Sequence, residues 1–192
     1  RIAGIFNTCG FDMVYFDGSE DVDRRRFHYY RSNAHAVVMR KCEKRPLIHM
    51  GGGRTHGLWH SFTRAGTIDQ YPGTYLAYIN AGGEIADWPT CKDHIDRTVQ
   101  RVVFSEQNMM PAELGWFGIG PKNGNYDGLQ FDEIEYLLCK SLAYNAPISL
   151  QTSFSRMEAH TLTPDILEVV RQYEKLRLAG QVADTTREQL KQ

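Results

Sequence analysis

Short apolar runs alternate with longer amphipathic segments along this chain, and this alternation limits the folds that are open to it. Five runs rich in β-branched or aromatic residues are typical of buried strands, and they end near Phe16, Met50, Asp69, Ile119 and Thr152. Helical segments lie between most of these runs. Because strands that alternate with helices are typical of a parallel sheet, the sequence predicts an α/β fold.

The predicted helices are recognised by apolar residues three or four positions apart. The segment 22–42 has such a stripe, formed by Phe27, Tyr30, Ala34, Val37 and Val38. Similar stripes follow in two later segments, 92–108 and 131–142. In the last helix, Thr163 is the predicted cap and Gly180 the predicted end.

The order of these segments predicts a (β/α)8 TIM barrel. If the strand that ends at Phe16 is the fourth of eight, residues 1–192 form the C-terminal part of one barrel domain, a fragment with roughly the last five strands. The partner that this fragment would need is the missing N-terminal half of the barrel. A doubly wound sheet of five strands is the alternative. No Gly-x-Gly-x-x-Gly follows a strand, and "GGGRTHG" lacks the Lys-Ser/Thr ending of a phosphate-binding loop.

Charge and hydropathy exclude two classes of partner. A formal net charge of −1 gives no broad basic surface, so we expect no nucleic-acid binding. No apolar run approaches the roughly 20 residues of a membrane-spanning helix, so we expect no membrane partner. The four cysteines are far apart and leave the compartment undetermined.

Carboxylates stand where two predicted strands stop, at Asp17 in "FDMVYFDGSED" and at Asp69. The carboxyl ends of parallel strands hold the chemistry of α/β enzymes, so both are candidate catalytic residues. Each of them could instead only form a turn, as we expect of Asp87. Glu20 lies within one helical turn of Asp17 and could replace it, or could simply favour a helix N-terminus. Glu113 begins its strand, and there we expect a structural role.

Taken together, these features resemble one family of enzymes. A strand that ends in aromatic-Asp-Gly, a helix, "RPLIHMGGGR" and then a Trp- and Arg-containing segment that ends in Asp resembles the retaining α-glycosidase barrels of the α-galactosidase and α-glucosidase type. The match covers residues 11–71. It implies that Asp17 is the nucleophile and Asp69 the acid/base. The sequence departs from the family because Gly18, Ser19 and Glu20 follow the first Asp, and no tryptophan directly precedes the second.

The chemistry agrees with this resemblance. Retaining glycoside hydrolysis needs two carboxyl groups about 5 Å apart, one ionised to attack the anomeric carbon and one protonated to release the leaving oxygen. The expected substrate is a carbohydrate, and no cofactor is required. Sugar-binding sites use aromatic faces and planar polar groups. The expected substrate-binding residues are Glu20, Arg54, His56, Trp59, His60 and Arg64.

Two other functions stay open. One is a carbohydrate-binding barrel without hydrolysis. The other is a metal-dependent hydrolase that uses His49, His56 and His60, although "HGLWH" lacks the Glu of His-Glu-x-x-His and the preceding glycines disfavour a helix. Trp116 lies within an apolar strand, so we expect it in the core rather than on a sugar.

Overall fold

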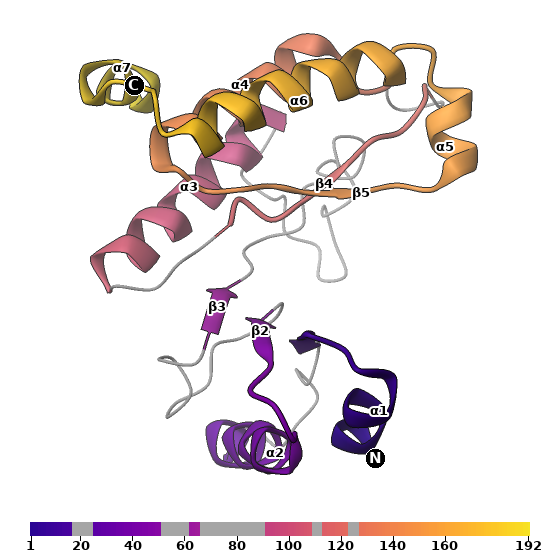
Figure 1. Ribbon diagram of the computed structural model, residues 1–192. Coiled ribbons are helices and arrows are strands. Elements are labelled where there is room, and N and C mark those ends of the chain that lie inside the picture. Colours follow the sequence, from indigo (N-terminus) through magenta and orange to yellow (C-terminus); the bar gives the residue numbers. More distant parts are fainter. Residues whose placement is uncertain (17–24, 51–61, 66–90, 109–112, 123–126) are drawn as a thin grey trace. The chain divides into compact units, whose positions relative to one another are not determined.

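The computed structural model describes residues 1–16, 25–50, 62–65, 91–108, 113–122 and 127–192 (Figure 1). The chain divides into two compact units. The first comprises residues 1–66 and 105–112, and the second comprises residues 67–104 and 113–192. Each unit contains its own parallel sheet.

The first unit is built on a three-stranded parallel sheet. Its elements are α1 (Ile2–Cys9), β1 (Met13–Phe16), α2 (Phe27–Lys41), β2 (Leu47–Met50) and β3 (Phe62–Ala65). The strands lie in the order β1-β2-β3, with an irregularity between Ile48 and His49. Phe16 is paired with Met50, and Met50 with Ala65, so the described parts of the three strands reach the same level.

The core of the first unit lies under α2. Phe16 and Ile48 are buried, and Val14, Val38 and Met39 pack against them. Val14 and Phe16 are two positions apart in β1 and therefore face the same side of the sheet. The helix between β1 and β2 thus covers the face that these apolar side chains form.

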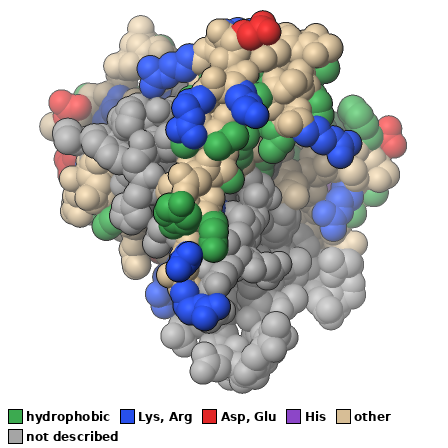
Figure 2. Space-filling model, turned by 90° about the horizontal axis from the view of Figure 1, so that it is seen from below, with side chains coloured by type: hydrophobic (Ala, Val, Ile, Leu, Met, Phe, Trp, Pro, Cys, Tyr) green, Lys and Arg blue, Asp and Glu red, His purple; other side chains and the backbone are tan. Residues whose placement is uncertain are grey.

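Burial along β1 increases toward its C-terminal end. Met13 is 54% exposed, whereas Phe16 is 9% exposed. Leu47, the register partner of Met13, is also exposed, as are Ile2 and Ile5 of α1. Figure 2 shows a face of the protein on which hydrophobic side chains lie among those of lysine and arginine. In β1, burial is therefore greatest at Phe16, the last described residue of the strand.

The second unit is mainly helical. Its elements are α3 (Cys91–Gln107), β4 (Trp116–Gly118), α4 (Phe131–Tyr144), β5 (Ser149–Gln151), α5 (Phe154–Ala159), α6 (Thr163–Ala179) and α7 (Asp184–Lys191). Of α3, the part up to residue 104 belongs to this unit. β4 and β5 pair in parallel. α4 contacts both α6 and α7, and the Tyr136 hydroxyl of α4 donates a hydrogen bond of 2.7 Å to Asp96 of α3. α4 is therefore the central helix of this unit.

The core of the second unit follows the predicted stripe of α4. Ile134, Leu137, Leu138 and Leu142 of that stripe are buried, whereas Phe131 at its start is partly exposed. They are joined by fully buried side chains from the surrounding segments: Ile95, Leu114, Phe117, Ile119, Leu129 and Ile166. Each such side chain stabilises the fold by roughly 1.5–3 kcal/mol relative to an exposed one.

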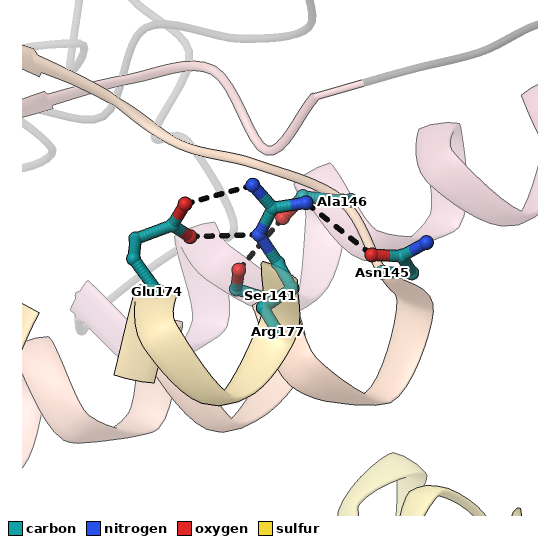
Figure 3. A network of polar contacts seen from close by, with 5 residues as sticks. All are labelled: Ser141, Asn145, Ala146, Glu174 and Arg177. Carbon is teal, nitrogen blue, oxygen red and sulfur yellow. Dashed lines mark hydrogen bonds and ion pairs between the residues drawn. The ribbon is translucent and has the colours of Figure 1, made fainter. Parts of the chain in front are cut away.

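A polar network joins α4 to α6 (Figure 3). Arg177 of α6 pairs with Glu174 at 2.7 Å and donates a hydrogen bond of 3.3 Å to the side chain of Asn145. Asn145 ends α4 in the left-handed conformation, with φ 46°. The Ser141 hydroxyl donates to the carbonyl of Ala146 at 2.8 Å. These contacts fix the turn that leads from α4 into β5.

The end of the last predicted helix is confirmed, but its predicted start is wrong in detail. Gly180 ends α6 with φ 63°, in the left-handed region that favours glycine. Thr163 does not cap the helix, because it is already the first helical residue and Leu162 occupies the cap position. The side chain of Thr163 is buried instead.

The prediction of a (β/α)8 barrel fragment with five strands is wrong. The described residues are mostly helical, and their strands form two separate parallel sheets of three and two strands. A barrel requires strands of matched length in one continuous, closed sheet. Here the predicted strand at 112–119 is reduced to Trp116–Gly118, because Gly115 has φ 92° and interrupts the extended backbone. Of the strand predicted to end at Asp69, the structure describes Phe62–Ala65, and Asp69 lies outside the described residues.

Gly128 provides a test of the packing in the second unit. Its φ is +88°, and a Cβ atom there would lie 3.0 Å from the backbone nitrogen of Lys122 and 3.2 Å from the His160 ring. We expect Gly128→Ala to lower the free energy of unfolding by about 1–3 kcal/mol, measured by urea denaturation. Gly120→Ala is the matched control, because a Cβ at Gly120 meets nothing within 4 Å. Equal unfolding midpoints for the two variants would contradict this account.

Candidate functional site

The candidate site is the side of the first sheet toward which its three parallel strands run. β1, β2 and β3 are adjacent, and their last described residues, Phe16, Met50 and Ala65, are register neighbours. In the sequence, Asp17 directly follows Phe16, the "GGGR" segment directly follows Met50, and Asp69 comes four residues after Ala65. Strand ends of this kind are where parallel sheets hold ligands and catalytic groups.

Most of the predicted site residues lie outside the described residues. These are Asp17, Glu20, Arg54, His56, Trp59, His60 and Asp69, and Asp87 lies outside as well. Arg64 falls on a described element, β3, where it is the register partner of His49. The roles assigned to these residues, and the convergence of Asp17 with Asp69, therefore stay predictions.

The described part of the site is the contact between β1 and α2. The rings of Phe16 and His35 lie 4.1 Å apart between their centroids, with a tilt of 30°. His35 is 7% exposed, and Arg31, one turn earlier on α2, is 3% exposed. Two basic side chains are thus buried on the face of α2 that covers the end of β1.

The charge state of His35 follows from this burial. Desolvation is the main reason that the pKa of His35 lies below its ordinary value of 6.5, and the positive charge of Arg31 lowers it further. The imidazole is therefore neutral at neutral pH. Arginine does not deprotonate in proteins, so Arg31 provides the fixed positive charge of this region.

The predicted apolar stripe of α2 agrees with its buried face only in part. Val38 of the stripe packs against the core. Tyr30, Ala34 and Val37 of the stripe are exposed, whereas Arg31 and His35 are buried. The two sets differ by one position, or about 100° around the helix. The spacing of Arg31, His35 and Val38 at i, i+4 and i+7 is a helical stripe too, but its charged members hide it from a search for apolar periodicity.

Glu113, the competing carboxylate, lies at the other end of its strand. It is buried, it precedes β4, and its Oε2 accepts a hydrogen bond of 3.4 Å from the Ser149 hydroxyl. Ser149 is the register partner of Trp116, the first residue of β4. Glu113 thus joins the beginnings of two paired strands, in agreement with the structural role that we expect for it.

Metal sites and membrane-spanning helices were both sought in the described part of the chain. Within the described ranges, no three His, Cys, Asp or Glu side chains gather to hold a metal ion. His56 and His60, which the metal hypothesis requires, lie outside those ranges. No described helix is both long enough and apolar enough to cross a membrane.

Comparisons of the chain with protein-family models, with curated proteins and with solved structures find no match. The resemblance to retaining α-glycosidases therefore depends on the short motifs in residues 11–71 alone.

The burial of His35 makes the stability of the protein depend on pH. The unfolded chain takes up a proton on this residue near pH 6.5, whereas the folded protein takes it up only at a lower pH. His35 therefore favours the folded state fully above about pH 6.5, and this contribution is lost as the pH falls below that value. His35→Phe keeps a ring against Phe16 but does not titrate.

We expect the urea midpoint of wild type to fall more steeply between pH 7.5 and 5.5 than that of His35→Phe. The carboxylates of the two proteins are the same, so the difference between the two curves isolates His35. Parallel curves over this range would show that the His35 ring is not protected from protonation by folding.

Proposed function

We propose that this protein hydrolyses a glycosidic bond of a carbohydrate by a retaining mechanism with two aspartates, Asp17 and Asp69. The observation that supports the proposal is the parallel adjacency of β1, β2 and β3, in which Phe16 is the register partner of Met50 and Met50 that of Ala65. In the sequence, Asp17 follows β1, the "GGGR" segment follows β2 and Asp69 follows β3. Strands that run side by side in this way are compatible with the expected convergence of the two aspartates.

The strand spacing supports a retaining mechanism. β2 separates β1 from β3, so two spacings of about 4.8 Å put the ends of the outer strands about 10 Å apart. A retaining mechanism requires carboxyl groups about 5 Å apart, and we propose that Asp17, directly after β1, and Asp69, four residues after β3, meet this requirement. The substrate would then lie above the end of β2.

The residues proposed to bind the sugar come from the chain between β2 and β3 and from its vicinity. Arg54, His56, Trp59 and His60 all belong to the sequence between these two strands, and Arg64 belongs to β3. Guanidinium and imidazole groups donate hydrogen bonds to sugar hydroxyls, and a tryptophan face packs against a pyranose ring. Glu20 follows β1 in the sequence and is proposed as a further contact from that side.

The proposed nucleophile is tested by Asp17→Asn, assayed on 4-nitrophenyl α-galactoside and α-glucoside. We expect kcat to fall by several orders of magnitude, because an amide cannot attack the anomeric carbon. Asparagine has nearly the same shape, so the variant should stay folded, as checked by circular dichroism. Asp12→Asn is the matched control: Asp12 precedes β1 at the opposite end of the strand and is exposed, with only a surface ion pair to Lys44. Turnover near wild type in Asp17→Asn on both glycosides would exclude the assigned role.

The proposed acid/base residue should behave differently. Asp69→Asn should hydrolyse a 4-nitrophenyl glycoside better than a natural glycoside, because nitrophenolate leaves without acid assistance. Azide should then restore turnover and yield a glycosyl azide of retained configuration, identified by proton NMR. A product of inverted configuration would refute the retaining mechanism. A wild-type protein that binds sugars without any turnover would instead indicate a carbohydrate-binding protein.

A further inference from the structure

The helix α7 is short and polar, and little apolar surface holds it on the second unit. It has eight residues, Asp184–Lys191, and an isolated helix of that length is marginal in water. Leu190 is its one large apolar side chain, and none of its residues is buried. Because apolar burial contributes little here, the docking of α7 depends on polar contacts.

The main polar contact comes from Lys140 of α4, the helix that α7 contacts. The Nζ atom of Lys140 donates hydrogen bonds of 3.3 Å to the carbonyl of Leu190 and of 3.2 Å to the carbonyl of Lys191. Both carbonyls belong to the last turn of α7, the end of a helix that carries a partial negative charge and carbonyls without intrahelical donors. One ammonium group therefore satisfies two carbonyls and complements the helix dipole.

Lys140 depends on α7 in turn. It is 5% exposed, and a buried ammonium group needs partners that replace its water. An ammonium has three N–H donors, and two of the hydrogen bonds of Lys140 go to α7. Removal of α7 would take both of these carbonyls away from a desolvated charge. The helicity of α7 and the burial of Lys140 therefore support each other.

The remaining surroundings of Lys140 include the ring of Tyr136, which is held by α3. The Nζ atom lies 5.0 Å from the centre of this ring, a distance typical of cation–π contacts. The Tyr136 hydroxyl donates to Asp96, and the Nζ atom of Lys92 lies 5.7 Å from the same ring. This part of the Lys140 site is thus fixed by α3 and α4, whereas the two carbonyls belong to α7.

A weaker contact also joins the end of α7 to α4. The Nζ atom of Lys191 lies 5.3 Å from the centre of the Tyr144 ring and pairs with Glu188 of α7 at 2.7 Å. Glu188 is exposed, and ion pairs of exposed side chains contribute little to stability. The buried ammonium of Lys140 is therefore the contact on which the position of α7 chiefly depends.

We propose that α7 is a releasable strap on α4 and that Lys140 holds it in the docked state. Residues 184–191 are helical while their last carbonyls bind Lys140, so the docking of α7 and its folding are one event. Release unfolds α7 and exposes the Lys140 ammonium, while α4 and α6 keep their own buried side chains, such as Leu138 and Ile166. This device belongs to the second unit and does not depend on the proposed function.

Amide hydrogen exchange measured by NMR tests the strap. We expect Lys140→Met, which keeps an apolar stem and removes the charge, to accelerate exchange in residues 187–191 by about 10- to 100-fold while exchange in α6 stays as in wild type. Lys140→Arg keeps the charge and should retain most of the protection. Lys175→Met, at an exposed position of α6, is the charge-matched control. Equal exchange of α7 in Lys140→Met and Lys175→Met would overturn the proposal.

A second experiment leaves Lys140 in place and covers the outcome in which Lys140→Met does not fold. Gln189→Pro breaks the helix inside α7 and should release it. Asp184→Pro is the matched control, because proline is tolerated at the first helical position and Ala183 before it is already extended.

The readout is the acetylation of lysines by acetic anhydride, followed by mass spectrometry of peptides. We expect Lys140 to react slowly in wild type and in Asp184→Pro, and to react in Gln189→Pro nearly as fast as the exposed Lys175. Lys140 that stays as slow in Gln189→Pro as in wild type would show that α7 does not cover it, and the strap would be refuted.

Discussion

The parallel pairing of β1 with β2 depends on α2, because parallel neighbours can only be joined by a crossover that returns the chain to the starting edge. That crossover must also cover the apolar face of the sheet. Val38 and Met39 meet this requirement by packing on Phe16 and Ile48. This contact surface therefore connects the parallel pairing of the strands with the choice of the helix face that is buried.

The same contact surface brings two bases out of water, and each must be accommodated differently. His35 can lose its proton, and the lowered pKa shows that burial against Phe16 favours this neutral form. Arg31 has no such option, because the guanidinium group of arginine keeps its proton in proteins.

The sequence predicted local features of the fold correctly, but it did not predict how the helices and strands pack together. Three predicted features are local: the strand at Phe16, the buried stripe of α4 and the glycine that ends α6. Each of them is determined by residues that lie close to one another in the sequence. The buried face of α2 is not, because the stripe with Tyr30 and the one with Arg31 have the same period, and only packing against Phe16 selects between them. Likewise, no local pattern indicates that β1, β2 and β3 form one sheet and that β4 and β5 form another. Strand pairing joins residues far apart in sequence, and this is where the barrel prediction failed.

The candidate catalytic residues could be named from the sequence, but their difference in ionisation could not. Asp17 and Asp69 have the same side chain and each follows a strand, so the sequence treats them alike. A retaining mechanism needs them to differ, with one ionised and the other protonated.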